Sequence, residues 1–157
     1  MSTDKDFHIK GLDCLRFGVE NLQDALRFAD DWGLKQVSAV QDNSYLFETT
    51  DGSQVEIFQA DSAHPERTPI GNPSGMCEIV WGVADQAGLD AIAAELRTDR
   101  DVTIDADGTV HSQDDLGIRL AFRLAKRSYI PFSDTQFNSP SQPKRINSRA
   151  PRYEKAQ

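Results

Sequence analysis

The fold is decided by two similar stretches, residues 14–33, CLRFGVENLQDALRFADDWG, and residues 78–96, EIVWGVADQAGLDAIAAEL. In each stretch, an apolar run typical of a strand leads into a pattern with apolar residues three and four positions apart, as on one face of a helix. Shifting the chain by 64 or 65 residues superimposes them, with Val19 on Val83. Self-similarity at a fixed spacing indicates repeated units, so the chain is predicted to be duplicated.

The ends of the two helices are marked in the sequence. Gly33 follows the first helical pattern and is expected to stop it, because glycine readily adopts the left-handed conformation that ends helices. Asp85 precedes the second pattern and is a good N-cap, since its carboxylate can accept a hydrogen bond from the first turn.

Three short strand candidates follow each helix, separated by turn signals such as Asp51-Gly52 and Asp107-Gly108. They lie at residues 36–40, 45–48 and 54–59 in the first copy and at 101–104, 109–112 and 118–124 in the second. Each copy is therefore βαβββ. One such unit of about fifty residues buries little apolar surface alone, so the two should pack together as an α+β domain with curved mixed sheets and the helices outside.

The chain is accordingly divided into a first module (1–61), a linker rich in Pro, Gly and Ser (62–75), a second module (76–132) and an extended tail (133–157). Residues 1–132 are expected to form one compact domain. The tail carries five Lys or Arg and two acidic residues, a net charge of +3. The whole chain has a net charge of −8, so residues 1–132 have a net charge of −11. With three prolines and no apolar period, the tail is typical of a connector.

The composition excludes several classes of protein. Hydrophobic residues make up 38% and charged residues 27% of the chain, as in globular proteins, and no apolar stretch approaches the roughly 18 residues of a membrane helix. The start lacks the apolar core of a secretory signal, which predicts a cytoplasmic protein. The acidic balance opposes nucleic acid as a partner. Cys14 and Cys77 lack metal or redox spacing and are expected to be reduced thiols.

Two tandem βαβββ modules of this length resemble the vicinal oxygen chelate superfamily, which includes glyoxalase I, bleomycin-resistance proteins, methylmalonyl-CoA epimerase and type I extradiol ring-cleavage dioxygenases. The resemblance covers residues 8–125. It rests on the openings LDCLRFGVENLQDALRFADDWGL and CEIVWGVADQAGLDAIAAEL, and on the strand DGSQVEIF, whose form is similar to the family's DG-x-x-[LIV]-E-[LIF].

The tail, FSDTQFNSPSQPKRINSRAPRYEKAQ, resembles the connector between the two domains of extradiol dioxygenases. In those enzymes the C-terminal domain binds Fe(II) or another divalent metal, and the N-terminal domain keeps the fold without the metal. The resemblance therefore implies that this chain is the N-terminal, non-catalytic part of a longer protein that cleaves catechol-type aromatics, with the C-terminal domain as its partner.

The resemblance also locates four positions that hold the metal in other members of the superfamily: Cys14, Glu56, Glu78 and Ala121. Only Glu56 is of the expected type without ambiguity, and none of the four is a histidine, although non-haem iron sites commonly use two imidazoles and one carboxylate. No metal or other cofactor is expected in this chain. The opposing hypothesis is a residual zinc or manganese site on Cys14, Glu56 and Glu78.

The remaining candidates have ordinary structural interpretations. His8, His64 and His111 are scattered and are expected to be surface or hydrogen-bonded core residues. Cys14 is expected to be a buried thiol rather than a nucleophile. Seven aromatic residues fall on apolar positions and are expected in the core: Phe17, Phe28, Trp32, Phe47, Phe58, Trp81 and Phe122.

Three arginines, Arg16, Arg119 and Arg123, lie on strands between apolar neighbours. They could line a cleft for an anionic ligand, and simple strand alternation explains them equally well.

Two alternative functions stay open. The first is a stand-alone binding protein of the bleomycin-resistance type, a homo-oligomer that holds a small aromatic or cationic compound. The second is a lyase or isomerase that uses a divalent ion on Glu56 and Glu78. The sequence has no phosphate-binding glycine loop, no GxSxG elbow and no HExxH motif that would favour another reaction.

Overall fold

A computed structural model describes residues 7–40, 43–71 and 73–127. The predicted tail, residues 133–157, lies outside the described residues. The first copy contains β1 (Ile9–Val19), α1 (Leu22–Trp32), β2 (Lys35–Val40), β3 (Ser44–Glu48) and β4 (Gln54–Gln59). After a short 3-10 turn, η1 (Pro65–Arg67), the second copy contains β5 (Gly75–Val83), α2 (Gln86–Leu96), β6 (Thr103–Ile104), β7 (Val110–Gln113) and β8 (Arg119–Leu124). The prediction of two βαβββ units is confirmed.

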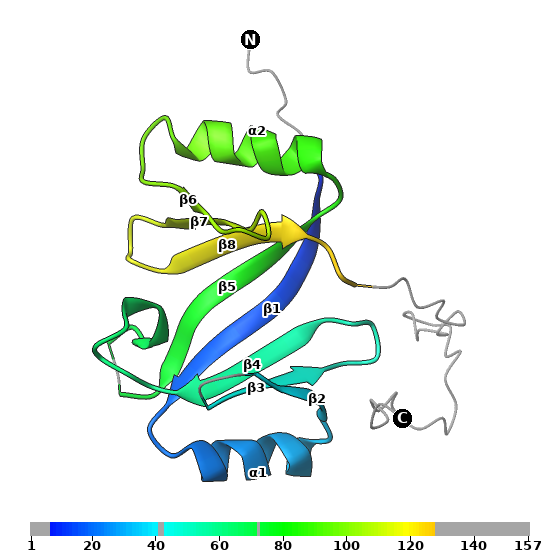
Figure 1. The fold of residues 1–157 in the computed structure, drawn as a ribbon, viewed down its shortest axis with the longest axis vertical. Coiled ribbons are helices and arrows are strands. Elements are labelled where there is room, and N and C mark those ends of the chain that lie inside the picture. The colour runs from blue at the N-terminus through cyan, green and yellow to red at the C-terminus, as the bar shows by residue number, and fades with distance from the viewer. Residues whose placement is uncertain (1–6, 41–42, 72, 128–157) are drawn as a thin grey trace, which may run out of the picture.

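The strands of the described residues form one curved sheet in the order β2-β3-β4-β1-β5-β8-β7-β6. Within each copy the first and last strands are parallel, β1 with β4 and β5 with β8. The two copies meet where β1 pairs antiparallel with β5, with Leu15 opposite Ile79 and Arg16 opposite Glu78. Figure 1 shows β1 and β5 side by side in the middle of the molecule and the two helices at its opposite ends.

The predicted helix ends are confirmed. The Asp85 carboxylate accepts a hydrogen bond of 2.9 Å from the Gly88 backbone N–H and caps α2. Gly33 ends α1 with a φ of 90°, a left-handed conformation that costs a residue with a Cβ atom about 1–2 kcal/mol. Asp85 and Gly33 therefore set these helix ends through contacts and backbone conformation within a single turn.

Strand alternation separates a helix-covered face of the sheet from an open face. Odd-numbered β4 residues such as Val55 and Ile57 pack with α1, while Glu56 points the other way. In the second copy Phe122 packs beneath α2 with Val83, and Ala121 lies on the opposite face. The two larger cores lie under the helices, and the open face of the sheet carries polar side chains around a small buried cluster of Cys14, Val80 and Ala121.

The expectation for the aromatic residues is wrong at Phe28 and Trp32. Phe47, Phe58 and Phe122 are buried, but Phe28 is 63% and Trp32 73% exposed. The stripe of α1 that packs on the sheet comprises Leu22, Ala25, Leu26 and Ala29. Phe28 and Trp32 lie beside this stripe and contact each other, with ring centroids 5.9 Å apart. A helical spacing alone does not fix where the buried stripe ends.

The first strand is longer than the apolar run at residues 14–19 predicts, because it begins at Ile9. Its added part includes polar residues and a bulge between Leu12 and Cys14, where Asp13 is an extra residue relative to β5. Asp13 is fully buried, and Cys14 and Cys77 are buried thiols without a disulfide. Neither α1 nor α2 has the length and hydrophobicity needed to cross a membrane.

Candidate functional site

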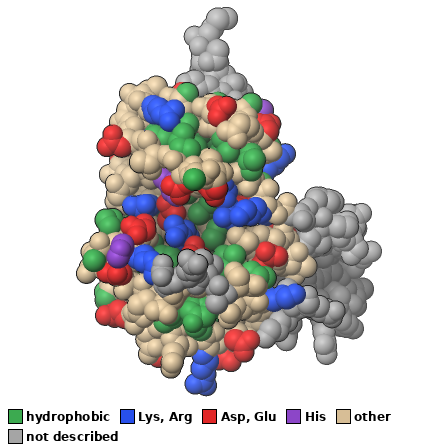
Figure 2. Space-filling view, in the orientation of Figure 1, with side chains coloured by type: hydrophobic (Ala, Val, Ile, Leu, Met, Phe, Trp, Pro, Cys, Tyr) green, Lys and Arg blue, Asp and Glu red, His purple; other side chains and the backbone are tan. Residues whose placement is uncertain are grey.

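A pocket of about 230 Å³ opens on the uncovered face of the sheet, where the two copies meet. Figure 2 shows basic and acidic side chains gathered around this hollow in the middle of the molecule. Every strand of the central group β4-β1-β5-β8 contributes to its wall, as do β3, β7, the turn between β6 and β7, and Lys126 after β8. The pocket is lined by Cys14, Arg16, Leu46, Gln54, Glu56, Glu78, Val80, Asp105, Thr109, His111, Ala121, Arg123 and Lys126.

The four positions singled out by the family resemblance, Cys14, Glu56, Glu78 and Ala121, all line this pocket. Cys14 and Glu78 lie on the two antiparallel central strands, and Glu56 and Ala121 on the strands that flank them. The shift of 64 or 65 residues explains this placement, because it relates β1 to β5 and β4 to β8.

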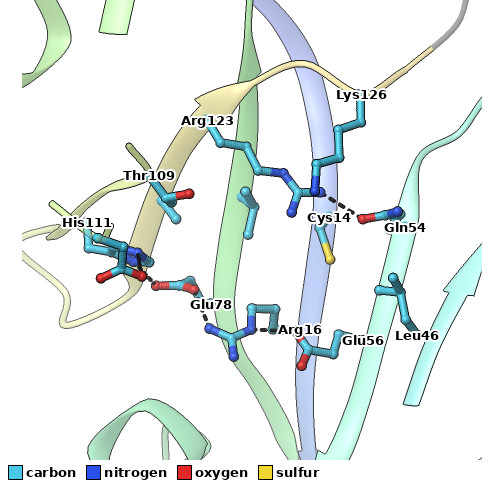
Figure 3. A pocket seen from close by; sticks show the side chains of 13 residues that line it. Cys14, Arg16, Leu46, Gln54, Glu56, Glu78, Thr109, His111, Arg123 and Lys126 are labelled. Atoms are coloured by element: carbon cyan, nitrogen blue, oxygen red, sulfur yellow. Dashed lines mark hydrogen bonds and ion pairs between the residues drawn. The ribbon is translucent and has the colours of Figure 1, made fainter. Parts of the chain in front are cut away.

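Arg16 occupies the space between the two glutamates (Figure 3). Its Nε donates to Glu56 Oε2 and its Nη1 to Glu78 Oε2, both at 2.8 Å. The guanidinium also lies 5.5 Å from the centroid of the buried Phe58 ring, a distance typical of a cation–π contact. Burial alone would lower the pKa of Arg16, but the two carboxylates outweigh it and raise this pKa. Arg16 is therefore a fixed positive charge inside the site.

Glu78 and His111 form a second chain of polar contacts. His111 Nδ1 lies 3.0 Å from Glu78 Oε1, and its Nε2 lies 3.0 Å from Asp105 Oδ2. Burial would raise the pKa of Glu78, yet hydrogen bonds from His111 and Arg16 hold it below its ordinary value. The hydrogen bond to Glu78 raises the pKa of His111 against the effect of burial. Glu78 is thus a carboxylate stabilised on both sides.

The other end of the pocket is held by Arg123. Its Nε donates to Asp13 Oδ2 at 2.5 Å, and its Nη2 donates to Gln54 Oε1 at 2.8 Å. The second oxygen of Asp13 accepts from the backbone N–H of Lys126 at 3.0 Å. The bulge in β1 therefore supplies the buried carboxylate that positions Arg123, and the short sequence patterns give no signal for this pairing.

Cys14 lies between Arg16 and Arg123, and its thiol has low reactivity. It is 3% exposed, and its Sγ contacts the Leu15 carbonyl oxygen at 3.6 Å. Burial raises the pKa of this thiol to about 11, although Arg123 acts in the opposite direction. A protonated thiol is neither a good nucleophile nor a metal ligand.

The residues present do not fit the divalent metal that the family resemblance implies for catalytic members. Glu56 and Glu78 already bind the Arg16 guanidinium, which would repel a cation placed between them. Ala121 has no ligand atom. Within residues 7–40, 43–71 and 73–127, no three His, Cys, Asp or Glu side chains lie close enough to hold an ion.

The structure separates the three histidines. His8 Nδ1 lies 2.9 Å from Asp85, the cap of α2, and His64 lies 2.8 Å from Asp61 in the linker. Only His111 reaches the pocket, from β7, which is separated from β5 by β8. Among the three predicted arginines, Arg16 and Arg123 line the pocket, whereas Arg119 Nε lies 3.8 Å from Glu78 without a hydrogen bond.

No known protein family model matches this sequence, and no curated protein sequence matches it. Solved structures are similar in fold. A variant of homoprotocatechuate 2,3-dioxygenase from Brevibacterium fuscum is 13% identical with a TM-score of 0.61, covering 77% of this chain and 34% of that chain. The 2,3-dioxygenase LapB from Pseudomonas sp. KL28 is 20% identical with a TM-score of 0.62, covering 77% and 42%.

The halotolerant catechol dioxygenase BphC, at 10% identity and a TM-score of 0.61, gives the same coverage as LapB. This chain therefore spans between a third and a little over two fifths of the length of these structures. The fold predicted from the resemblance to the vicinal oxygen chelate superfamily is confirmed, and it is the fold of one part of each of these dioxygenases.

Proposed function

We propose that this chain is the N-terminal, non-catalytic domain of an extradiol dioxygenase-like protein that opens catechol-type aromatic rings. In this proposal Fe(II) is held by a C-terminal domain of the same polypeptide, which is also the main partner of the present domain. The fold shared with part of three dioxygenases supports the proposal. The proposal includes a cytoplasmic location, which is supported by two buried thiols that form no disulfide.

The contact of Arg16 with Glu56 and Glu78 carries the proposal. A catalytic iron site needs vacant coordination positions and ligands that are free to bind the ion. Here the two carboxylates are each hydrogen-bonded to one guanidinium at 2.8 Å, and Glu56 also accepts a hydrogen bond from Ser44. The same contact opposes a lyase with a divalent ion on these glutamates, because that ion would first have to displace Arg16.

The test compares two proteins, the full product of the natural gene and this 157-residue chain. Both are loaded anaerobically with Fe(II), and iron content and cleavage of catechol are measured. The proposal predicts one iron and ring cleavage for the full product, and neither for the chain alone. Iron-dependent cleavage by the 157-residue chain would contradict it, and so would a natural gene product that ends at Gln157.

A stand-alone binding protein is a second candidate, because the pocket is open and has a partly apolar lining. This function predicts a homodimer that binds a small molecule without iron. Sedimentation of the natural gene product distinguishes the two, since the first proposal requires a chain longer than this one.

A further inference from the structure

We propose that the pocket binds a small planar aromatic carboxylate, with the ring on the apolar floor and the carboxylate toward Arg123 and Lys126. This inference goes beyond the proposed domain role and does not depend on it, because the site uses no metal and lies wholly within this chain.

The floor of the pocket is apolar. Cys14, Val80 and Ala121 form a buried cluster of their own, with exposures of 3%, 4% and 0%. Leu46 from β3 lines the same space. Cys14, Val80 and Ala121 come from the adjacent strands β1, β5 and β8, so together they close the bottom of the pocket with apolar atoms on which one edge or face of a ring can pack.

The size of the pocket suits a ligand with one aromatic ring. Its volume is about 230 Å³. An apolar cavity of about 150 Å³ is large enough to hold benzene, whereas sites for drug-sized ligands begin at about 300 Å³. A single aromatic ring with one polar substituent therefore matches the space.

One end of the pocket offers cationic donors. Arg123 donates from Nε to Asp13 and from Nη2 to Gln54, and within the described part of the chain no hydrogen bond engages its Nη1. The Lys126 ammonium makes no hydrogen bond or ion pair with the residues that the structure describes. The pKa of Asp107 is lowered chiefly by a hydrogen bond from the Thr109 backbone N–H, and the charges of Lys126 and Arg123 contribute to lowering it. Figure 3 shows both side chains on the same side of Cys14, opposite Arg16. A ligand carboxylate at this end can accept charge-assisted hydrogen bonds, which are about twice as strong as neutral ones.

The other end of the pocket fixes the orientation of the ligand. It carries the acids Glu56, Glu78 and Asp105, which hydrogen-bond to Arg16 and His111. A ligand carboxylate placed at this end would be repelled by these acids, because Arg16 and His111 already form hydrogen bonds with them. The ligand carboxylate is therefore directed toward Arg123 and Lys126, and the ring toward Cys14 and Val80.

The test is calorimetric titration of the 157-residue chain with benzoate, with acetate and benzamide as probes that lack the ring or the charge. We expect saturable binding of one benzoate per chain, and at least about tenfold weaker binding of each control probe. Methyl NMR signals of Val80 should shift with benzoate at the same midpoint. The proposal would be overturned if benzoate binding did not saturate at benzoate concentrations below about 10 mM, which corresponds to a binding free energy weaker than roughly 3 kcal/mol.

Lys126→Gln tests the cationic end, and Lys10→Gln is the matched control. Both lysines are exposed, but Lys10 lies at the start of β1 and does not line the pocket. We expect Lys126→Gln to weaken benzoate binding by about 3- to 10-fold and Lys10→Gln to leave it unchanged. Equal affinities of the two variants for benzoate would show that benzoate does not bind beside Lys126. Acetate binding as tightly as benzoate would show that the aromatic ring does not contact the apolar floor. Either result overturns this proposal while leaving the iron test of the domain role unaffected.

Discussion

Arg16 holds together two carboxylates that would otherwise repel each other across the pocket. Glu78 is 1% exposed and Glu56 is 18% exposed at the side chain, so neither is well solvated. Removing the shared cation leaves the buried Glu78 with His111 and Glu56 with Ser44 as hydrogen-bonding partners, and loss of one partner of a buried ion pair is strongly destabilising.

Arg16→Ala should therefore lower the free energy of unfolding by about 3 kcal/mol in urea denaturation at neutral pH. The matched control is Arg27→Ala, because Arg27 forms an ion pair with Asp31 at 82% and 70% exposure. Such a surface pair should contribute less than about 1 kcal/mol. Equal losses in the two variants would show that Arg16 does not stabilise the pocket.

His111 should make stability depend on pH in a defined direction. The hydrogen bond to Glu78 is the chief cause that raises the pKa of His111 above 6.5. Its contribution to the free energy of unfolding is therefore full below pH 6.5 and is lost as the pH rises through the pKa of the folded state. The pKa of Glu78 is lowered from 4.5, so its contribution is lost only as the pH falls below that value.

His111→Gln should consequently destabilise the protein more at about pH 6 than at about pH 9, as measured by chemical denaturation at both values. His64→Gln provides the baseline, because His64 is an exposed linker residue outside the pocket. A larger loss of stability for His111→Gln at about pH 9 than at about pH 6 would contradict a raised pKa of His111 in the folded protein.

The two cysteines should be inert in the folded protein. Burial raises the pKa of Cys14 to about 11 and also raises that of Cys77. At pH 7 a thiol of that pKa is thiolate in only about one molecule in 10⁴. Reaction with a thiol reagent should be slow until denaturant is added and should then account for two thiols per chain. Rapid labelling of Cys14 in the native state would contradict this assignment.

Among the elements, the end of α1 depends on the left-handed conformation of Gly33. Its φ of 90° is costly for a residue with a Cβ atom, and asparagine tolerates it better than alanine. Gly33→Ala should lower the free energy of unfolding by about 1 kcal/mol, and Gly33→Asn by less. A stability order with alanine above asparagine would contradict the capping interpretation.

The elements follow local rules, and this explains why the sequence predicts them. Asp85 and Gly33 act through hydrogen bonds and backbone conformation within one turn of the helix, so a short window of sequence contains the information. The start of β1 at Ile9 is missed because the bulge at Asp13 interrupts the alternation on which strand prediction relies.

The contacts of the candidate site depend on strand register instead. Alternation predicts that Cys14 and Arg16 share a face, but it does not tell which residue of β5 lies opposite Arg16. That residue is Glu78, and His111 joins it from two strands further along the sheet. Pairing across 62 and 33 residues of sequence leaves no local signal.

At the scale of the whole molecule, duplication both creates the pocket and allows its two ends to differ. The antiparallel pairing of β1 with β5 brings the four related strands together. The shift of 64 residues places Cys14 on Glu78 and Arg16 on Val80, so an arginine in one copy corresponds to an apolar residue in the other. The apolar floor and the Arg16 bridge thus come from sequence divergence within one fold.

Between the two copies, Arg16 binds Glu56 and Glu78 at positions that hold a metal ion in other members of the superfamily. Metal analysis of the 157-residue chain, after anaerobic reconstitution with Fe(II) and removal of unbound iron, shows whether iron can displace this arginine. We expect far less than one iron per chain, because Glu56 and Glu78 stay bound to Arg16. One tightly held iron per chain, with Glu56 and Glu78 as ligands in a crystal structure, would contradict it.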